Sequence, residues 1–591
     1  MRSQTRREFL KTVGFATASM ATTSILPGCA NIRQIRNGKR KQPNVVLVIT
    51  DDQGYGDLGC HGNPIIQTPN IDRFYSQSIR LTNFHVDPTC SPTRSALMTG
   101  RYSSRTGVWH TVMGRSLLRK DEVTLAQLFS AGGYRTGIFG KWHLGDNYPF
   151  RPQDRGFEEV LIHGGGGVGQ TPDYWGNDYF DDTYFLNGKP HKYTGYCTDV
   201  FFNRAMEFIE ANKDRPFFAY LCTNAPHSPF NVAEKYSKPY QDKGLPQDLA
   251  RFYGMITNID ESMGRLTQHL KQLGLEENTI LVFMTDNGSS RGDFNAGMRG
   301  KKGAVYEGGH RVPLFIHWPA GGLNGGRDIS TLTAHIDLLP TLVELCSLKK
   351  PQSVKLDGVS LVPLLTSEGN NWPDRTLFVH SQRIDHPEKW RNIAVMTERW
   401  RLINGRELYD IKTDPGQSNN IADGHSQVVE KLRESYERWW ADISKRFDEY
   451  CEIIIGSDKE NPVRLACHDW HGPQAPSDQN AIRQGLEANG FWAVEVARNG
   501  KYEFSLRRWP LEANMPINSA VPPERSIGAT RARLKIADVD VTAPIPEDAC
   551  EVTFQIPLKA GKTRLQTWFT DSQSTSRGAY FVYVKRLSQE H

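Results

Sequence analysis

Asn44-Val45-Val46-Leu47-Val48-Ile49-Thr50 is an unbroken run of mostly aliphatic residues that ends directly in Asp51-Asp52. Such a run, rich in β-branched side chains, is typical of a strand that is buried on both faces, as in a parallel sheet. A matching run, Thr279-Ile280-Leu281-Val282-Phe283-Met284-Thr285, ends in Asp286-Asn287. Open α/β sheets bind ligands at the carboxyl ends of their strands. We therefore predict an α/β sheet whose binding edge carries both polar pairs.

Apolar strand-like runs and amphipathic helical stretches continue to about residue 370, and we assign residues 43–373 to this α/β domain. The run Pro216-Phe217-Phe218-Ala219-Tyr220-Leu221 is another predicted strand. Amphipathic stretches at 199–212 and 248–273 are predicted helices.

Residues 374–454 have shorter elements, which predict a small antiparallel sheet with one helix at about 426–448. Its expected strands are Thr376–His380, Asn392–Thr397, Trp400–Ile403 and Glu407–Asp410.

Residues 455–591 are mostly β in pattern, and we predict an accessory β-sandwich. Asn499-Gly500 is a strong hairpin signal between the alternating segments Ala493–Val496 and Tyr502–Leu506. Further strands are expected at 532–541, 552–556 and 564–569. Four tryptophans either fill the sandwich core, which we favour, or stack on sugar rings: Trp470, Trp492, Trp509 and Trp568.

The composition is that of a soluble globular protein, with 38% hydrophobic and 23% charged residues. No apolar run after residue 30 is long enough to span a bilayer. The nine cysteines are scattered and form no CxxC pair, so we expect neither a zinc site nor a disulfide framework, although one or two bridges remain open.

The segment with the most chemical information is Pro88-Thr89-Cys90-Ser91-Pro92-Thr93-Arg94-Ser95-Ala96-Leu97-Met98-Thr99-Gly100. Pro92 suits a first helical turn, so the helix dipole and free N–H groups would favour an anion beside Cys90. Arg94 would add a forked cation. From these residues alone, a capped helix with a small buried cysteine is the alternative.

The whole segment resembles the C-x-P-x-R signature of the sulfatase family. A second family signature resembles Gly133-Tyr134-Arg135-Thr136-Gly137-Ile138-Phe139-Gly140-Lys141-Trp142-His143-Leu144-Gly145. The resemblance is to formylglycine-dependent type I, arylsulfatase-like members of the alkaline phosphatase superfamily. It implies a mixed sheet flanked by helices, and it covers residues 43 to about 450 but not 455–591.

By this resemblance, a maturation enzyme oxidises Cys90 to formylglycine (3-oxoalanine), whose hydrate is the nucleophile. The resemblance also places one cation on Asp51, Asp52, Asp286, Asn287 and the modified Cys90. Hard oxygen donors select calcium or magnesium, and because most family members bind calcium we expect Ca²⁺. Without the family, paired carboxylates at a strand end would equally suit helix capping or a solvated turn.

The resemblance further implies a set of cationic or proton-carrying residues: Arg94, Lys141, His143, His227 and Lys302. Sulfate ester cleavage needs fixed positive charge and a proton donor for the departing alcohol. We choose Lys302 over the adjacent Lys301 because Lys302 precedes Gly303, as the family lysine precedes a glycine. Arg311, in the same motif, is expected to support the fold.

The implied reaction divides these roles. Asp286 takes a proton from the Cys90-derived diol, whose oxygen then attacks sulfur. Calcium, Arg94, Lys141 and Lys302 hold the sulfate oxygens, and His227 with Lys302 protonates the leaving oxygen. His143 then deprotonates the second hydroxyl, so that sulfate leaves by elimination.

The N-terminus is a processing segment. Residues 1–28 resemble a twin-arginine (Tat) signal around Arg6-Arg7, and Leu26-Pro27-Gly28-Cys29 resembles a lipobox. An ordinary signal peptide with a chance cysteine is the alternative. Residues 29–42 suit a tether. We therefore expect Tat export to the periplasm or cell envelope, with a possible membrane anchor at a lipidated Cys29.

The formal charge of +5 falls to +2 without residues 1–28, because 67 basic and 65 acidic residues remain. No nucleic-acid partner is expected from so small a charge.

Together these observations predict an exported sulfatase (a sulfuric ester hydrolase) that acts on a sulfated carbohydrate, a polysaccharide or its fragments. One alternative is a phosphodiesterase or phosphonate monoester hydrolase of the same superfamily. Another is an inactive carbohydrate-binding lipoprotein. The glycine-rich segment 163–190 is a candidate rim for substrate recognition.

Overall fold

The run Asn44–Thr50 forms strand β1 in the interior of a ten-stranded sheet, and all seven of its residues are buried. β1 pairs in parallel with β8 (Phe217–Cys222) on one side and β9 (Thr279–Thr285) on the other. Because Thr50 lies beside Thr285 in the register, the polar pairs that follow β1 and β9 leave the sheet at the same edge. The predicted binding edge is thus formed by two adjacent strands.

This computed structural model describes residues 42–366, 372–520 and 525–588. The predicted signal peptide, Cys29 and the tether up to residue 41 lie outside the described residues.

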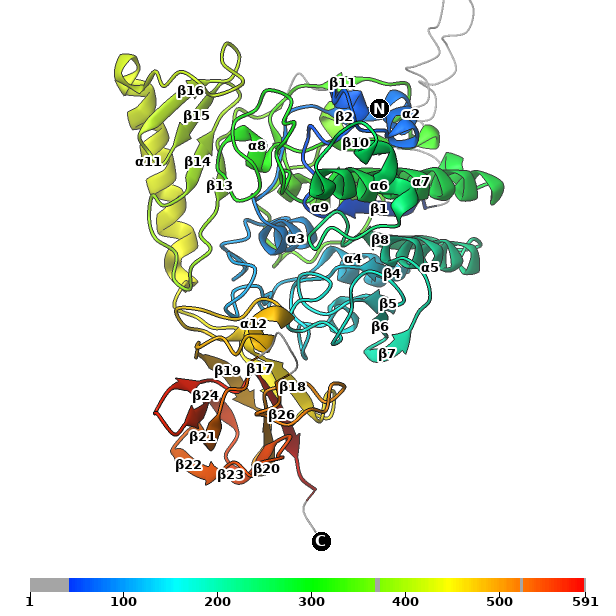
Figure 1. Cartoon of the computed structure of the whole chain (residues 1–591). Helices are drawn as coiled ribbons and strands as arrows, with labels where there is room; N and C mark the ends of the chain where they lie inside the picture. Colours follow the sequence, from blue (N-terminus) through cyan, green and yellow to red (C-terminus); the bar gives the residue numbers. More distant parts are fainter. Residues whose placement is uncertain (1–41, 367–371, 521–524, 589–591) are drawn as a thin grey trace, which may run out of the picture. The chain divides into compact units, whose positions relative to one another are not determined.

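The sheet is mixed, which confirms the predicted fold class (Figure 1). The strands β1, β4, β5, β8 and β9 run parallel, whereas β10 pairs antiparallel with β9 and β6 with β5. In order, the sheet comprises β11 (Asp328–Ile329), β2 (Ile79–Leu81), β10 (Leu314–His317), β9, β1, β8, β4 (Arg135–Gly140), β5 (Glu159–Ile162), β6 (Thr183–Leu186) and β7 (Lys189–Lys192).

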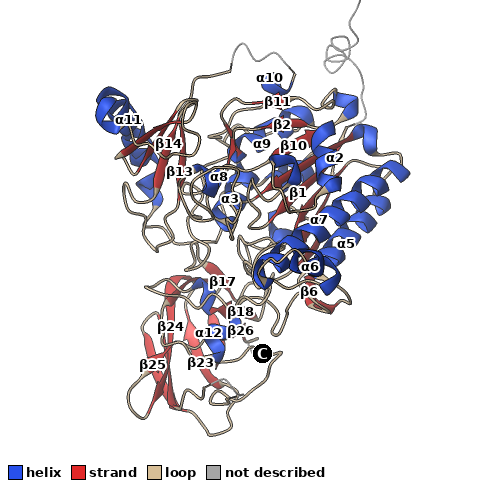
Figure 2. Cartoon of the chain, turned by 45° about the horizontal axis from the view of Figure 1, so that its top comes forward, coloured by secondary structure: helices blue, strands red, loops and turns tan. Residues whose placement is uncertain are grey.

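Helices cover both faces of the sheet. Alternate residues of β1 therefore pack into two separate apolar cores, one on each face. Val46 and Val48 pack in the core that includes helices α2 (Pro69–Gln77), α5 (Cys197–Ala211) and α7 (Gln247–Gln272). Figure 2 shows these three helices together on one side. The other core contains residues of α3 (Cys90–Thr99), α4 (Leu125–Ala131) and α9 (Leu338–Leu345).

The predicted small antiparallel sheet with one helix is confirmed in the chain after residue 376. Its strands, in order, are β13 (Leu377–His380), β14 (Ile393–Met396), β15 (Trp400–Ile403) and β16 (Glu407–Asp410). Helix α11 (Ser426–Ile443) packs on it, with the rings of Phe378 and Trp439 stacked at 4.6 Å. The exact boundaries at 373 and 454 stay predictions, since the chain from residue 41 onward forms one compact unit.

The C-terminal region contains two further sheets that enclose one apolar core. One sheet contains β17 (Ile453–Ile455), β19 (Phe491–Val496), β24 (Gly561–Asp571), β21 (Ala529–Ile536), β22 (Val539–Pro544) and β25 (Ser576–Arg577). The other contains β18 (Val463–Ala466), β26 (Phe581–Arg586), β20 (Gly500–Arg507) and β23 (Val552–Leu558). Trp470, Trp492 and Trp509 are fully buried in this core, which confirms for these three the preferred prediction that they fill it. Trp568 is half-buried beneath the guanidinium of Arg533.

The hairpin predicted at Asn499-Gly500 is wrong, because β19 and β20 belong to different sheets. The buried side chains of both strands, such as Val494 of β19 and Phe504 of β20, belong to the one apolar core that lies between the two sheets. Asn499 instead accepts a hydrogen bond from the backbone N–H of Ala560. A hairpin does occur within the predicted strand 532–541, where β21 and β22 turn at Ala537 (φ 49°).

Among the described residues all cysteines are free, so no bridge forms there. Within the same part of the chain, no helix is both long and apolar enough to cross a bilayer.

Candidate active site

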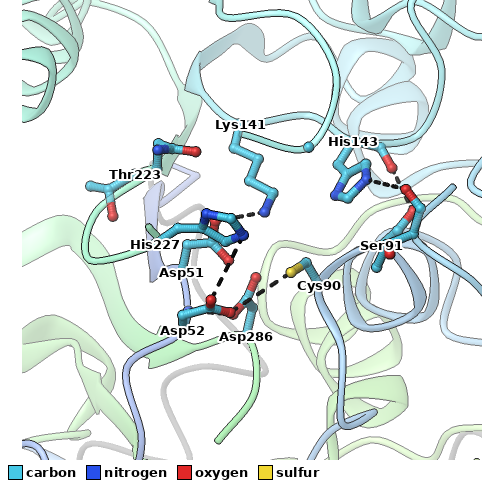
Figure 3. A network of polar contacts seen from close by, with 12 residues as sticks. Asp51, Asp52, Cys90, Ser91, Lys141, His143, Thr223, His227 and Asp286 are labelled. Atoms are coloured by element: carbon cyan, nitrogen blue, oxygen red, sulfur yellow. Dashed lines mark hydrogen bonds and ion pairs between the residues drawn. The ribbon is translucent and has the colours of Figure 1, made fainter. Parts of the chain in front are cut away.

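Three aspartates meet where β1 and β9 end, and all three are buried (Figure 3). The backbone N–H of Asp52 donates to Asp286 Oδ1 at 3.1 Å, which ties the two strand ends together. Asp52 has a φ of 65°, a left-handed conformation that is uncommon for a residue other than glycine. The local backbone therefore turns immediately after the strand and brings the Asp52 carboxylate beside Asp286.

Cys90 is the first residue of α3, and its thiol points toward the aspartates, 3.9 Å from Asp52 Oδ1. The helix begins here because Thr89 is extended and Pro92 fits the first turn, and it ends at Gly100 in a left-handed conformation. Burial, and then the carboxylate of Asp51, raise the pKa of the Cys90 thiol to about 12. An unmodified Cys90 is thus a protonated thiol at neutral pH and a poor nucleophile.

Each aspartate pairs with one cation. Lys141 Nζ lies 2.6 Å from Asp51 Oδ2, and Lys302 Nζ lies 2.6 Å from Asp52 Oδ1. Arg94 reaches Asp286 Oδ2 with Nη2 at 2.8 Å and Nε at 3.2 Å. Three carboxylates and three cations leave this cluster with no net charge.

The electrostatics differ between two of these carboxylates. Burial tends to raise the pKa of Asp52, but Lys302, His227 and Lys141 outweigh it and hold that pKa well below its usual range. Burial, and then the charge of Asp51, raise the pKa of Asp286 above its usual range, although Arg94 opposes them. Asp286 is therefore the carboxylate of the cluster that is best suited to accept a proton.

Within the described residues, the side-chain oxygens Asp51 Oδ1 and Asn287 Oδ1 at the strand ends are buried and accept no hydrogen bond. Buried polar atoms are rarely left unpaired. Asn287 Nδ2 donates to Asp52 Oδ1 at 3.0 Å, so its carbonyl oxygen is oriented away from that contact. The ligand atoms of Asp51, Asp52 and Cys90 lie within 4.8 Å of one another. Unpaired acceptors among carboxylates fit a hard cation such as Ca²⁺ or Mg²⁺.

A second cluster of possible metal ligands, His85, Glu307 and His310, is already internally paired. The Nδ1 atoms of the two histidines lie 2.9 Å apart, and Arg401 Nε donates to Glu307 at 2.7 Å. With a buried guanidinium in contact, this cluster is a structural network. Arg311, as expected, serves the same region, since its Nε donates to the carbonyl of Thr82.

His143 lies next to Cys90 and is held in one orientation (Figure 3). Its Nε2 lies 2.9 Å from the carbonyl oxygen of Thr111, so Nε2 carries the proton and donates it there. The other ring nitrogen, Nδ1, is buried and has no hydrogen-bond partner in the described part of the chain. Burial, and then the charge of Lys141, lower the pKa of His143 well below its usual range. His143 is therefore a neutral imidazole with a free lone pair.

His227 and Lys302 complete the group around Cys90. His227 Nδ1 donates to the carbonyl of Ser228 at 2.6 Å, and its Nε2 lies 3.8 Å from Asp52 Oδ2. Burial lowers the pKa of His227 to about 4, partly against the effect of Asp52. Lys302 contacts Asp52, whereas the neighbouring Lys301 is exposed, and its side-chain stem lies 3.2 Å from a Cβ atom added at Gly292. The two lysines thus point to different surroundings.

A pocket of about 310 Å³ opens above these groups. Of the residues expected from the sequence, Cys90, His143, His227 and Lys302 line it, whereas Arg94, Lys141, Asp51, Asp52, Asp286 and Asn287 are not among its lining residues. The segment 163–190 contributes in part, through Gly166 and Gln170.

Sequence reasoning missed other residues of the pocket: His110, Thr111, Arg383, Gln474 and Ser477. Thr111 acts through its backbone carbonyl, for which a sequence carries no signal. Arg383 and Gln474 lie in loops outside every motif.

Comparison with known proteins supports one family for this arrangement. A family model described as Sulfatase matches residues 43–348, and one described as N-sulphoglucosamine sulphohydrolase, C-terminal, matches residues 299–441. Human arylsulfatase A is 30% identical over 446 residues, which covers 65% of this chain and 84% of that protein. Rat N-acetylgalactosamine-6-sulfatase is 30% identical over 383 residues, 59% of this chain and 71% of that protein.

Among solved structures, Ps i-CgsB in complex with k-i-k-neocarrahexaose is similar, with a TM-score of 0.64 and 29% identity. That likeness covers 70% of this chain and 95% of the other.

Proposed function

The chain belongs to the sulfatase family and is a sulfuric ester hydrolase, and from this premise we propose that it removes sulfate from a sulfated carbohydrate with a formylglycine made from Cys90 and one Ca²⁺. The observation that carries the proposal is that Cys90, Lys302 and two neutral imidazoles line one pocket, while Arg94 and Lys141 are held by the aspartates beside Cys90. An anionic ester needs such a concentration of fixed positive charge.

The residues that would hold the ion are Asp51, Asp52, Asp286 and Asn287, together with the modified Cys90. Bound there, the ion would supply Lewis-acid polarisation of a sulfate oxygen, and the hydrated aldehyde would supply a hydroxyl nucleophile that the thiol of Cys90 cannot replace. The two unpaired oxygens, Asp51 Oδ1 and Asn287 Oδ1, support this assignment.

The chain's own residues then divide the proton and charge transfers. Asp286, with its raised pKa, accepts a proton at its carboxylate, while Arg94 fixes that carboxylate in position. Lys141 and Lys302 hold negative oxygens of the ester. These cations are in place before reaction, so little reorganisation is needed as charge develops.

Two histidines serve opposite ends of the reaction. His143 Nδ1 accepts a proton, because Thr111 keeps the proton of this ring on Nε2. His227 Nε2 delivers a proton to the departing alcohol, with the ammonium of Lys302 beside it. A bound sulfate ester places negative charge next to His227, which raises its pKa and favours the protonated ring.

The carbohydrate part of the proposal draws on the similar proteins. These include rat N-acetylgalactosamine-6-sulfatase and Ps i-CgsB, whose structure is that of a complex with k-i-k-neocarrahexaose. A sugar alcohol as leaving group is also consistent with the polar lining of the pocket.

Export through the Tat machinery to the periplasm or cell envelope, lipidation of Cys29 and maturation by a formylglycine-generating enzyme complete the proposal. They are supported by Arg6-Arg7, Leu26–Cys29 and the Cys90 signature.

The test is mass spectrometry of the peptide containing Cys90, combined with sulfate release from 4-nitrophenyl sulfate. We expect an aldehyde at Cys90 in active enzyme and no turnover by Cys90→Ala. Active enzyme with an unmodified thiol would overturn the proposal. Faster cleavage of bis(4-nitrophenyl) phosphate than of the sulfate ester would favour the phosphodiesterase alternative.

A further inference from the structure

A loop of the C-terminal β-region, residues 470–478, packs against the glycine-rich segment 163–176. The backbone N–H of Thr171 donates to Ser477 O at 3.2 Å, and Thr171 Oγ1 donates to Pro476 O at 2.9 Å. Gln170 and Asp478 form an antiparallel bridge. The loop is thus joined to the α/β domain by backbone hydrogen bonds on both sides of the bridge.

The next residue, Gln479, strengthens this junction at the start of α12 (Gln479–Arg483). Its backbone N–H donates to Gly169 O at 3.0 Å, and its side-chain Nε2 donates to the carbonyls of Gln170 and Tyr174, both at 3.2 Å. Gln479 is buried, with 5% of its surface exposed. Its side chain therefore fixes the position of the loop and is not available to a ligand.

Through this junction the C-terminal region reaches the active-site pocket. Gln474, Ala475 and Ser477 line the pocket that contains Cys90. The side chain of Gln474 is exposed and has no hydrogen-bond partner among the described residues. A free amide with both donor and acceptor capacity is suited to sugar hydroxyls.

Arg383, from the loop after β13, lines the same pocket. Its Nη1 would lie 3.9 Å from a Cβ atom added at Gly303, the residue that follows Lys302. Arg383 is exposed, and within the described ranges its guanidinium has neither an ion pair nor a hydrogen bond. Lys302, by contrast, is already paired with Asp52.

The rest of the lining favours an anionic sugar. No aspartate or glutamate is among the lining residues, nor is any phenylalanine, tyrosine or tryptophan. Recognition here must therefore use charge and hydrogen bonds, without stacking on a large aromatic ring. A volume of about 310 Å³ lies at the lower end of ligand pockets, roughly 300 to 1,000 Å³, which suits one sugar residue.

We infer that Arg383 and Gln474 form a subsite for the sugar that is released, and that Arg383 binds a second anionic group on it. This second group is a further sulfate or a carboxylate, distinct from the ester held over Cys90. The inference rests on the proposed function. It makes the C-terminal β-region a wall of the active site, and it makes a multiply charged glycan the preferred substrate class.

The test measures binding to the Cys90→Ala protein by calorimetry, so it does not depend on turnover. Two matched pairs of probes are compared. D-glucosamine-2-N,6-O-disulfate against N-acetylglucosamine 6-sulfate tests a second sulfate. An unsaturated chondroitin 6-sulfate disaccharide against the same disaccharide with its uronate carboxyl methyl-esterified tests a carboxylate. We expect the doubly charged member of at least one pair to bind about 10- to 100-fold more tightly, the size of one charge-assisted hydrogen-bonded contact.

Arg383→Gln should abolish that preference, Arg383→Lys should retain part of it, and Gln474→Ala should weaken both members of a pair equally. The control is Arg438→Gln, an exposed arginine on α11 that does not line the pocket. It should keep the full preference.

Equal binding of both members in both pairs would overturn the inference, as would a preference that survives in Arg383→Gln. Failure of the proposed function has a different signature, namely no sulfate release by the wild-type enzyme whose Cys90 carries the aldehyde.

Discussion

Replacing Asn287 with leucine should selectively weaken calcium binding. The side chain keeps a similar size but loses the buried Oδ1, which accepts no hydrogen bond from the described residues, and the Nδ2 that donates to Asp52. Asn287 follows directly on Asp286 at the end of β9 and is fully buried. If its oxygen is a ligand, the stability gained from calcium must fall when it is lost.

The magnitude follows from the contacts. A buried acceptor that loses its partner costs about 1 to 3 kcal/mol. In affinity this is about 5- to 150-fold, since 1.4 kcal/mol corresponds to a factor of ten. Calcium also adds two positive charges to a cluster in which three carboxylates already face three cations. Because the carboxylates are already balanced by these cations, the affinity for calcium should depend strongly on an uncharged ligand oxygen such as Asn287 Oδ1.

The assay is thermal unfolding of the Cys90→Ala protein against free calcium, buffered with a chelator. Calcium at 100 times its Kd should stabilise the parent by about 2.7 kcal/mol. Asn287→Leu should shift the midpoint of this response to about 5- to 150-fold higher calcium.

Asn258→Leu is the matched control. Asn258 is also buried with an unpaired Oδ1, and its Nδ2 donates to Asp199, but it lies in α7 away from the site. It should change the unfolding temperature without changing the calcium midpoint. A Cys90→Ala protein whose unfolding temperature does not change with calcium, or equal shifts of the calcium midpoint in Asn287→Leu and Asn258→Leu, would refute the reasoning.

Three further predictions concern named side chains. Lys302→Ala should lower kcat/KM for 4-nitrophenyl sulfate by about 100- to 1,000-fold, as for loss of one preorganised charge donor, whereas Lys301→Ala should stay close to wild type; equal effects would contradict the assignment. His143→Gln should lower kcat by at least about 100-fold while urea unfolding changes little, and a large loss of stability instead would mean a structural role. Arg401→Met should destabilise the fold by about 3 to 5 kcal/mol in urea unfolding, because it removes the guanidinium that hydrogen-bonds the buried Glu307 carboxylate and leaves that carboxylate with the more distant Arg311, at 3.5 Å. Burial tends to raise the pKa of Glu307, but Arg401, His85 and His310 outweigh it and lower that pKa in the folded protein. As the pH falls, the Glu307 carboxylate is therefore protonated in the unfolded chain before it is protonated in the folded one. The Glu307 contribution to stability should therefore be present above about pH 4.5 and be lost as the pH falls further. In Arg401→Met this acid dependence should be reduced, and an unchanged pH profile would count against the pairing.

The local sequence pattern was sufficient to predict the type and position of helices and strands that have one clear hydrophobic periodicity. β1 and β9 are continuous apolar runs, so each could be predicted as a doubly buried strand, and helix α7 begins and ends within one residue of its expected range. The Asn499-Gly500 hairpin failed because alternation identifies a strand with one apolar face but not the neighbour that covers it. The apolar faces of β19 and β20 pack across the sandwich core, and their edges pair with strands distant in sequence.

The active site shows the same division. Cys90, Arg94 and the strand-end acids follow fixed local patterns, and the sequence alone was enough to group them by resemblance to a family. Thr111 orients His143 through a backbone carbonyl, which every residue type possesses, so no side-chain pattern marks it.

The sequence by itself was enough to predict the chemistry at Cys90, because helix starts, strand ends and short motifs are local properties of the chain. Only the tertiary structure brought Arg383 and Gln474 to the pocket, and only it gave the partner of Lys302, the carboxylate of Asp52. These positions depend on contacts between segments hundreds of residues apart, such as Thr171 with Pro476. Such contacts depend on the packing of whole sheets, and no short stretch of sequence encodes them.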